Sequence, residues 1–485
     1  MQKVWSISGR SIAVSALALA LTACQSMRGP EPVAQANIPE QGYLTASSGP
    51  SIAEQGYKDF FADQRLLQVL DLALANNRDL RTSTLNIQRA QQQYQITQNN
   101  QLPTIGASGS VLRQDTLNTG AMTSYNVGLG VTAYELDFWG RVRSLKDNAL
   151  DTYLATSSAR DATQIALVGQ VAQAWLNYSF ANANLRLADQ TLKAQLESYN
   201  LNKKRFDVGI DSELPVRQAQ ISVETARNDV ANYKTQIAQA QNLLNLLVGQ
   251  AVPANLLPTQ RVTRITTNNA LTAGLPSDLL TNRPDVRAAE YQLSAAGANI
   301  AAAKARLFPT ISLTGNAGYA STSLSDLFKS GGFVWSIGPS IDLPIFDWGT
   351  RQANIKISET DQQIALSDYE KSIQSAFREV NDALAVRQNI GDRLAAQRRL
   401  VDATNTTYRL SNARFRAGID SYLTVLDAQR ASYAAEQGLL LLEQANMNNQ
   451  VEVYKTLGGG IKANTSDAVL QPASTAERKA ANSAQ

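Results

Sequence analysis

The sequence predicts a mainly α-helical protein that also contributes strands to a membrane β-barrel. Three observations lead to this fold class: an internal repeat, long segments with an apolar residue at every seventh position, and four short segments in which apolar and polar residues alternate. The repeat divides the 485-residue chain into two halves of one design. The same order of helix, two strands, long helix and returning helix is expected in each half.

A ten-residue motif occurs twice and fixes the offset between the halves. It reads RFDVGIDSEL from Arg205 to Leu214 and RFRAGIDSYL from Arg414 to Leu423, 209 positions later. Self-similarity at a fixed offset is the signature of a duplicated structural unit. The matched positions include Trp139 with Trp348, Gly249 with Gly458 and, at an offset of 206, Pro103 with Pro309.

The segment before each motif is predicted to be one very long helix. From Arg351 to Ala417 there is no proline, and these 67 residues make a helix of roughly 100 Å at about 1.5 Å per residue. Apolar residues at a spacing of seven keep a seam facing a partner helix. They stand at Ile373, Val380, Leu394, Val401, Tyr408 and Phe415, and in the first half at Val171, Tyr178, Leu185, Leu192, Tyr199 and Phe206.

Shorter helices are expected to return from the two motifs, over 212–248 and 421–457. Pro253, Pro258, Pro276 and Pro284 follow the first of them, so 249–284 cannot be one helix. This stretch is predicted to form a belt around the helices, joined by the N-terminal segment to about Asp63 and by the C-terminal tail. Two rising helices, over 64–100 and 285–306, complete the helical set.

Over 104–113 and 125–137, and again between 309 and 346, the apolar residues recur at every second position and no longer with helical spacing. Strands of about ten residues, apolar on one face and small or polar on the other, are typical of membrane barrels. A soluble sandwich with one wet face is the alternative, but it does not explain two hairpins that grow from long helices. The loops 114–124 and 321–332 are polar. The apolar face is expected to carry Tyr125, Val127, Leu129, Val131 and Ala133, then Ile311, Leu313, Ala317 and Tyr319, and finally Phe333, Trp335, Ile337, Ile341 and Leu343, whereas Asn126, Gly128, Gly130, Thr132 and Tyr134 face the other way.

Four strands are too few for a closed barrel, because about eight is the practical minimum. An open sheet in lipid would leave backbone groups unpaired, at several kcal/mol each. The barrel must therefore be shared between chains. Two, three or four copies would give eight, twelve or sixteen strands, and the pattern by itself does not choose among them.

Composition argues against catalysis and against nucleic acid. The net charge is only +3, there is no histidine, and Cys24 is the single cysteine, so no disulfide can form within the chain. A nucleic-acid partner would need a basic stripe. We expect no catalytic residues, no metal site and no cofactor, and therefore no enzyme.

The N-terminus predicts export and lipid attachment. Lys3 and Arg10 precede an apolar run that is too short to span a membrane, as in a secretory signal peptide over 1–23. The signal ends in Leu21-Thr22-Ala23-Cys24, which resembles the lipobox of bacterial lipoproteins and implies a diacylglyceryl thioether on Cys24 and acylation (palmitate) of the new amine. The alternative is an incidental cysteine near an ordinary cleavage site. Gln25 follows, where an aspartate would favour the inner membrane, so the outer membrane is expected.

The predicted domain organisation follows these boundaries. It comprises a signal peptide at 1–23, a lipidated tether and belt segment at 24–63, a first repeat at 64–248 with barrel strands within 104–137, an equatorial belt linker at 249–284, a second repeat at 285–457 with barrel strands within 309–346, and a flexible tail at 458–485.

These features together resemble the TolC-type outer-membrane efflux proteins, and within them the lipoprotein branch that includes OprM. The resemblance rests on the lipobox, the repeat, YELDFWGRV at 134–142, LPIFDWG at 343–349, NRPDV at 282–286, the two tip motifs and Leu457-Gly458-Gly459-Gly460. It implies a homotrimer with a shared twelve-stranded barrel and a periplasmic α-helical coiled-coil tunnel of twelve helices. Its implied partners are outer-membrane lipid, a periplasmic adaptor (membrane fusion) protein and an inner-membrane pump of the resistance-nodulation-division type. The implied function is passive export of antibiotics and other toxic amphiphiles.

The resemblance also implies site residues at the second motif. Leu423 and Asp427 match the apolar and acidic rings at which the family narrows its periplasmic aperture. Three leucines could close a pore by packing, and three carboxylates would disfavour anions. The alternative is that Leu423 is helix-packing core and Asp427 a solvated surface residue. Some relatives lock the tip through polar links whose positions correspond here to Phe415, Asp420 and Pro215, so those links are absent.

The two turns have a structural and a functional interpretation. Gly209 and Gly418 can close the long helices at positive φ, and Ser212 and Ser421, with Asp211 and Asp420, can cap the returning helices. In the family, the same turns form grooves for the adaptor's helical hairpin. The implied adaptor-binding residues are Arg205, Gly209, Ser212, Arg414, Gly418 and Ser421.

Two other functions compete with drug efflux. A type I protein-secretion outlet would share the channel architecture, and lipidation with OprM-like motifs favours efflux over it. A structural coiled-coil lipoprotein would explain the heptads but not four amphipathic strands inserted between helices.

Overall fold

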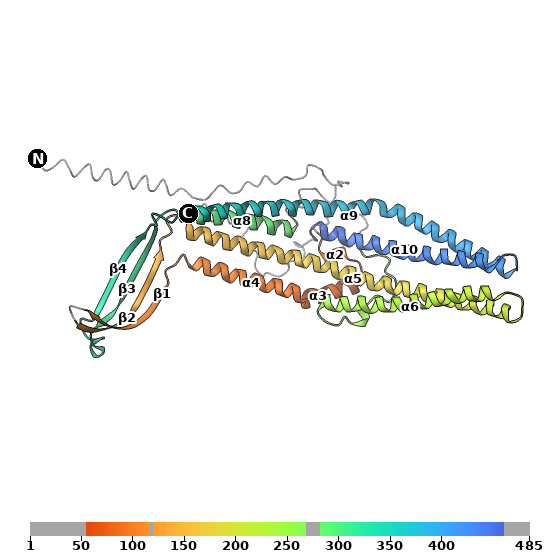
Figure 1. Ribbon diagram of the computed structural model, residues 1–485, viewed down its shortest axis with the longest axis horizontal. Helices are drawn as coiled ribbons and strands as arrows, with labels where there is room; N and C mark the ends of the chain where they lie inside the picture. The colour runs from red at the N-terminus through yellow and green to blue at the C-terminus, as the bar shows by residue number, and fades with distance from the viewer. Residues whose placement is uncertain (1–54, 117–119, 268–281, 460–485) are drawn as a thin grey trace. The chain divides into compact units, whose positions relative to one another are not determined.

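The computed structural model describes residues 55–116, 120–267 and 282–459 (Figure 1). The predicted signal peptide, Cys24, most of the tether and nearly all of the tail lie outside these residues. The chain forms two compact units. The sheet unit contains Asn86–Ser157 and Ala288–Lys371, and the hairpin unit contains the described residues of Ile38–Leu85, Ser158–Arg287 and Ser372–Gln485.

Two long helices match the sequence prediction in length. Helix α5 covers Arg141–Asp207 and helix α9 covers Thr350–Arg416, with 67 residues each. Carboxylates cap their first turns: Asp137 accepts hydrogen bonds from the backbone N–H groups of Val142 and Arg143 at 3.0 and 2.9 Å. Asp347 accepts one from the N–H of Arg351 at 3.1 Å. An anion at this end also complements the helix dipole.

The sheet unit contains one antiparallel sheet in the order β1-β2-β3-β4. The strands are β1 (Ile105–Thr116), β2 (Gly120–Glu135), β3 (Thr310–Ser321) and β4 (Phe333–Asp342), with a short 3₁₀ turn, η3 (Leu324–Asp326), between the last two. The first hairpin is longer than predicted, because most of the expected loop 114–124 is paired, for example Gln114 with Met122. Polar residues continue the ladder there because its hydrogen bonds come from the backbone, which side-chain patterning does not report.

A β-bulge in β2 corrects part of the predicted face assignment. Val131 pairs with Gly315, but Tyr134 pairs with Leu313, so β2 holds one residue more than β3 between these pairs. Ala133 takes up the extra length at φ 51°. Directly paired residues share a face, so Tyr134 lies on the apolar face with Val131 and not on the opposite face, as strict alternation predicted. The bulge depends on the pairing with β3, which β2 alone does not encode.

The rising helix predicted over 64–100 is two helices. Helix α3 (Gln64–Asn76) ends and α4 (Arg78–Asn99) begins at Asn77, which has extended ψ of 132°. The side-chain Oδ1 of Asn77 accepts a hydrogen bond from the backbone N–H of Leu80 at 2.8 Å, as a helix N-cap does. The other rising helix, α8, covers Pro284–Ala305, close to the predicted 285–306.

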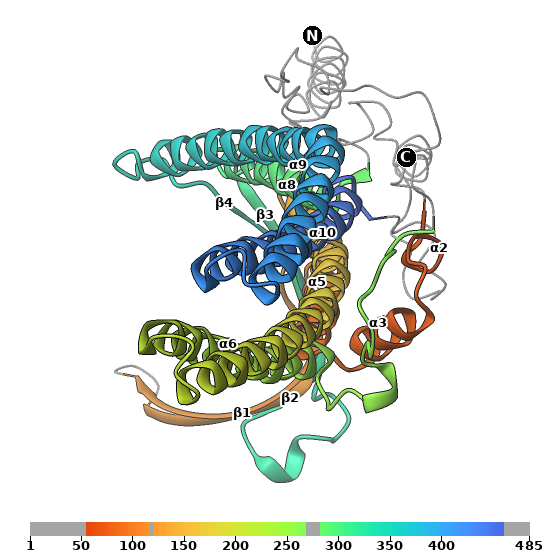
Figure 2. The ribbon, with the colours of Figure 1, turned by 90° about the vertical axis from the view of Figure 1, so that its right-hand side faces the viewer.

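The returning helices are α6 (Glu213–Val248) and α10 (Tyr422–Thr456). Figure 2 shows the hairpin unit with α5 turning into α6 and α9 turning into α10. Polar contacts join the hairpins: the Tyr433 hydroxyl donates to Asp229 at 3.0 Å, and the Gln437 amide donates to the Tyr233 hydroxyl at 3.0 Å. Across the described ranges, no helix combines the length and the apolar character needed to cross a membrane.

The described part of the predicted belt packs on α5. The indole of Trp175 donates to the carbonyl of Leu256, in the 3₁₀ turn η2 (Ala254–Leu256), at 3.1 Å. Beyond the short helix α2 (Tyr57–Phe60), Phe61 forms a β-bridge with Thr266, so the N-terminal segment joins this linker as predicted. Residues 268–281 of the linker lie outside the described ranges.

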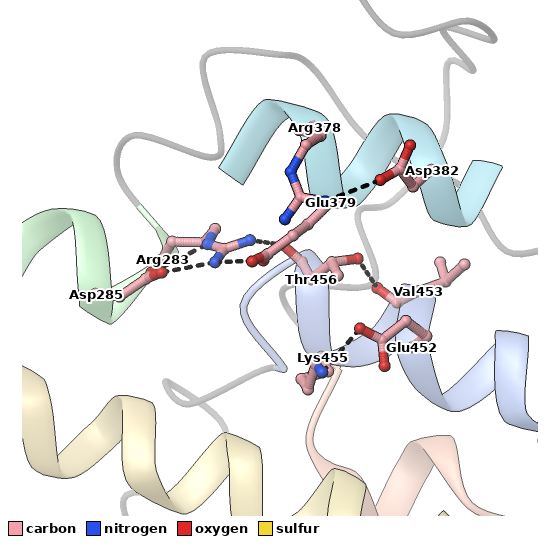
Figure 3. Close-up of polar contacts among 9 residues, drawn as sticks. All are labelled: Arg283, Asp285, Arg378, Glu379, Asp382, Glu452, Val453, Lys455 and Thr456. Carbon is pink, nitrogen blue, oxygen red and sulfur yellow. Dashed lines mark hydrogen bonds and ion pairs between the residues drawn. The ribbon is translucent and has the colours of Figure 1, made fainter. Parts of the chain in front are cut away.

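Arg283, in the NRPDV motif, joins three helices (Figure 3). It is only 7% exposed. Its guanidinium binds Asp285 at the start of α8 at 2.6 Å and Glu379 on α9 at 2.8 Å, and it donates to the carbonyl of Thr456 at the end of α10 at 3.1 Å. Burial disfavours the charge, but the hydrogen bonds and charges of the two carboxylates outweigh it and raise the pKa of Arg283.

Candidate functional site

The two tip turns have the same backbone. Gly209 and Gly418 stand at φ 75° and 76°. Each glycine N–H donates to the carbonyl three residues back, and the next N–H, of Ile210 or Ile419, donates to the carbonyl of Arg205 or Arg414 at 2.9 or 3.0 Å. This is the Schellman arrangement, which ends a helix with a left-handed residue. The predicted closure of both long helices by glycine is confirmed.

Each turn is also tied by an arginine–aspartate pair that spans it. Arg205 binds Asp211 at 2.7 Å, and Arg414 binds Asp420 through two hydrogen bonds at 2.6 and 2.9 Å. The Arg414 hydrogen bonds hold the pKa of Asp420 below its usual range. Arg205 also lies over the ring of Phe415 at 5.2 Å, so the first turn reaches the second hairpin.

Ser212 and Ser421 occupy the N-cap positions of α6 and α10, as predicted, but their side chains do not make a capping hydrogen bond. The aspartates before them, Asp211 and Asp420, bind the arginines instead. An extended Ncap residue can start a helix through its backbone alone, at some cost in stability. The prediction is therefore right about position and wrong about the contact.

Leu423 and Asp427 lie one helical turn apart on an exposed face of α10. Leu423 is 50% exposed, and Asp427 is also exposed. Positions i and i+4 share a helix face. The core beside them is built from Ala219, Phe415, Tyr422, Val425 and Leu426. Within one chain Leu423 therefore lies outside the packed core, whereas the exposure of Asp427 fits both an aperture residue and a solvated surface residue.

Burial of Tyr422 in that cluster raises the pKa of its hydroxyl to about 12. The ring of Tyr422 packs on Phe415 with centroids 5.6 Å apart. Tyr422 and Leu423 are adjacent in sequence, yet one is in the core and the other is on the surface. The i, i+3 and i+4 pattern from Tyr422 to Val425 and Leu426 is the signal that distinguishes them.

The tips also present apolar residues that sequence reasoning did not single out. The exposed ones are Val208, Ile210, Leu214 and Ile419. Contiguous exposed apolar residues mark interaction surfaces more often than isolated ones do. The recurrence of isoleucine directly after the turn glycine, at 210 and 419, was the available signal.

The sheet has the chemistry of a membrane surface. Its apolar face carries exposed Ile105, Leu129, Phe333, Trp335, Ile337 and Ile341 within one chain. On the other face, Ser312 bonds Ser340 at 2.7 Å and Ser336 bonds Asn316 at 2.7 Å. The outer edges of β1 and β4 have no neighbour in the four-stranded sheet. Such edges are not tolerated in lipid unless another chain pairs with them.

Comparison with known proteins gives consistent matches over most of the chain. The family model described as "Outer membrane efflux protein" matches residues 69–250 and 275–459. The toluene efflux pump outer membrane protein TtgC of Pseudomonas putida is 43% identical over 439 residues, covering 88% of this chain and 90% of that protein. The cation efflux system protein CusC of Escherichia coli is 38% identical over 457 residues, covering 92% and 98%.

A solved structure shows the same fold. The open state of the MtrE outer membrane channel of Neisseria gonorrhoeae matches with a TM-score of 0.82 and 38% identity, covering 88% of this chain and 97% of that one. The predicted combination of long helices with barrel strands is thereby confirmed. The chain belongs to the outer membrane efflux protein family: it resides in the outer membrane, extends into the periplasm and serves as the exit channel of an efflux pump.

Proposed function

We propose that three copies of this chain form a passive duct with one shared barrel of twelve strands and one tunnel of twelve helices. The observation that carries the proposal is the four-stranded sheet with an exposed apolar face and two free edges. Pairing β1 of one copy with β4 of another satisfies both edges and places the apolar face toward lipid. The polar face then lines the pore.

The energy for transport through the duct comes from its partner proteins. Transport against a gradient needs an energy source, and we assign it to an inner-membrane pump of the resistance-nodulation-division type, reached through a periplasmic adaptor. The chain itself performs no enzymatic step. The names of its relatives concern toluene, solvents and cations. For this chain we propose toxic amphiphiles, antibiotics included, as the cargo.

The periplasmic aperture is assigned to Leu423 and Asp427. Both are surface residues on one face of α10, and the core of the tip is complete without them. In a trimer each would occur three times around the axis. Leucine rings exclude water by packing, and a ring of carboxylates attracts cations.

The adaptor is proposed to dock on the two tip turns. The turns match in backbone, in the arginine–aspartate pairs and in their exposed isoleucines, so each chain offers two similar docking turns. The docking residues are Arg205, Gly209, Ser212, Arg414, Gly418 and Ser421. The apolar side chains of Val208, Ile210, Leu214 and Ile419 would be covered by the adaptor's helical hairpin.

Three measurements test this function together. Native mass measurement in detergent should give three copies, and a dimer or tetramer would contradict the proposed assembly. Purified protein in a planar bilayer should conduct ions through discrete channels, which a structural lipoprotein would not do. A strain lacking the gene should become more susceptible to a panel of amphiphilic antibiotics, dyes and detergents, and unchanged susceptibility would contradict the proposed cargo.

A further inference from the structure

The two Trp-Gly turns that lead into the long helices are equivalent in sequence but not in their surroundings. Trp139 stacks on Phe308 with ring centroids 4.8 Å apart, and its indole N–H donates to the carbonyl of Pro309 at 2.7 Å. Its counterpart Trp348 is 88% exposed and touches Phe346 edge-on. Trp348 also stands at φ 55°, which is costly for a residue with a side chain. A large apolar ring held in this way indicates a missing partner.

The repeat identifies what the partner surface must be. Phe308 and Pro309 lie where α8 leads into β3, and at the offset of 206 their counterparts are Leu102 and Pro103, where α4 leads into β1. Leu102 is 66% exposed. Within one chain β1 and β4 are the two outer strands of the sheet. The exposed ring of Trp348 lies at the β4 edge, and the exposed Leu102 and Pro103 lie at the β1 edge. Such opposite placement is expected of a head-to-tail contact between copies.

The helices of the sheet unit show the same asymmetry. On α5, Asp151, Leu154 and Ala155 are buried, and Asp151 accepts a hydrogen bond from Ser294 of α8 at 2.6 Å. Their counterparts on α9, at the offset of 209, are Thr360, Gln363 and Ile364, and all three are exposed, Ile364 by 56%. The face of α9 that corresponds to the α8-covered face of α5 is thus open.

The strand pairing supplies a register for the same contact. Ile105 pairs with Val131 in the first hairpin, and Ile311 pairs with Ile341 in the second, so Val131 corresponds to Ile341. Between the hairpins, Gly130 pairs with Asn316. Gly130 corresponds to Ser340, because the two directly precede Val131 and Ile341, and Asn316 corresponds to Ser110 at the offset of 206. The same pairing at the free edges would therefore place Ser340 of β4 opposite Ser110 of β1.

We propose that Trp348 of one chain docks on Leu102 and Pro103 of a second copy, repeating the contact of Trp139 with Phe308 and Pro309. The indole ring covers Leu102, and its N–H donates to the carbonyl of Pro103. Strand β4 of the first chain continues onto β1 of the second with Ser340 opposite Ser110. The contact rests on the proposed shared barrel and specifies how its copies join. Contact of Trp348 with lipid headgroups is the competing outcome.

Cysteine cross-linking tests the register. A Ser340→Cys, Ser110→Cys chain should form disulfide-linked multimers on a non-reducing denaturing gel, because opposite residues come close enough for a disulfide. Within one chain the two positions lie three strand spacings apart, at least about 14 Å, and they are also displaced along the strands, because Ser340 pairs with Ser312 and Ser110 pairs with Asn126. A link must therefore join copies. The matched control is Ser340→Cys, Ser108→Cys, which is on the same strand face but two residues out of register.

The outcomes separate this inference from the assembly itself. Preferential linking of the control pair, or no linking in protein whose native mass is still that of a trimer, overturns the register while the shared barrel stands. Protein that is monomeric in detergent without any substitution contradicts the barrel as well.

A double-mutant cycle tests the docking of Trp348. Trp348→Ala and Leu102→Ala should each lower the temperature at which the oligomer dissociates, and the double variant should fall no further than the larger single effect. The Trp139→Ala variant is the control, and its effect should add to that of Leu102→Ala. Additive effects of Trp348→Ala and Leu102→Ala, with quenching of Trp348 fluorescence by brominated lipid, would place the ring in lipid and overturn the docking.

Discussion

Asn77 and Arg283 are equivalent residues of the two repeats, and each donates a hydrogen bond to the equivalent carbonyl of a returning helix. The Asn77 amide binds the carbonyl of Leu247 at 2.8 Å, and the Arg283 guanidinium binds that of Thr456 at 3.1 Å. Carbonyls at helix ends lack an intrahelical partner. Each residue therefore directly precedes one helix and donates a hydrogen bond to a carbonyl at the end of another. This contact fixes where the returning helix of each repeat stops.

The Arg283 cluster should be important for stability. Arg283→Ala leaves Glu379 without its buried partner and the Thr456 carbonyl without a donor, and we expect a loss of roughly 2–3 kcal/mol. Arg378→Ala is the matched control, on α9 beside Glu379. Arg378 pairs with Asp382 at an exposed site, and such pairs contribute about 0.5 kcal/mol. Thermal unfolding in detergent, followed by helical circular dichroism, compares the two. Equal losses would contradict a special role for Arg283.

Two glycines at positive φ should respond differently to alanine. A Cβ at Gly249 (φ 78°) would come within 2.4 Å of the carbonyl oxygen of Asn76, whereas one at Gly209 (φ 75°) would meet nothing within 4 Å. Gly209→Ala should cost about 1 kcal/mol from backbone strain alone. Gly249→Ala should cost clearly more, because backbone must also move. Denaturant unfolding of both variants measures the difference, and a larger loss at Gly209 would refute the close approach at Gly249.

The aperture assignment predicts changes in conductance. The resting channel should conduct poorly in a planar bilayer, Leu423→Ala should raise its conductance, and Asp427→Ala should weaken its cation preference. Neither change should alter trimer stability much, because both side chains are exposed outside the tip core. The control is Leu426→Ala, one turn along and buried, which should destabilise the tip instead. Parental conductance in both aperture variants would place the constriction elsewhere.

Acid should loosen the second tip turn. The Arg414 pair lowers the pKa of Asp420, so its stabilisation is fully present above the ordinary carboxyl pKa and is lost as pH falls through the lowered value. A spin label at Arg416 should become more mobile in that range. Asp420→Asn should show the acid-like mobility already at pH 7. A label whose mobility is the same in parent and variant at pH 7 would show that the pair does not hold the turn.

Lipid attachment should be dispensable for assembly. Cys24→Ala removes the only thiol to which a diacylglyceryl group could be attached, yet four amphipathic strands per chain should still insert and pair. We expect loss of metabolic palmitate labelling with trimers retained in the outer-membrane fraction. Recovery of the variant wholly as soluble monomer would contradict independent anchoring by the barrel.

Several features that the sequence predicted well are local. Both 67-residue helices are single elements, because helix continuity depends on spacing, on the absence of proline and on caps within a few residues. The tip turns were equally predictable, since a glycine at C′ needs only its own helix to form the Schellman bonds. Even the pairing of apolar residues such as Ile311 with Ile341 follows from alternation.

Other features depend on segments far away in the chain. Asn77 interrupts a continuous helical pattern, and its side-chain amide binds the carbonyl of Leu247, 170 residues later. A pattern read over neighbouring residues does not show this contact. The bulge that turns Tyr134 to the apolar face needs β3 as a template.

By itself, then, the sequence determined the two long helices, the positions of the two turns and, before the bulge in β2, which strand faces are apolar. Only the tertiary structure decided that Tyr422 and not Leu423 fills the core of the tip, and that Trp139 is covered while Trp348 is exposed. The physical reason is that periodicity and capping act within a few residues, whereas burial depends on which distant surface arrives at a given side chain.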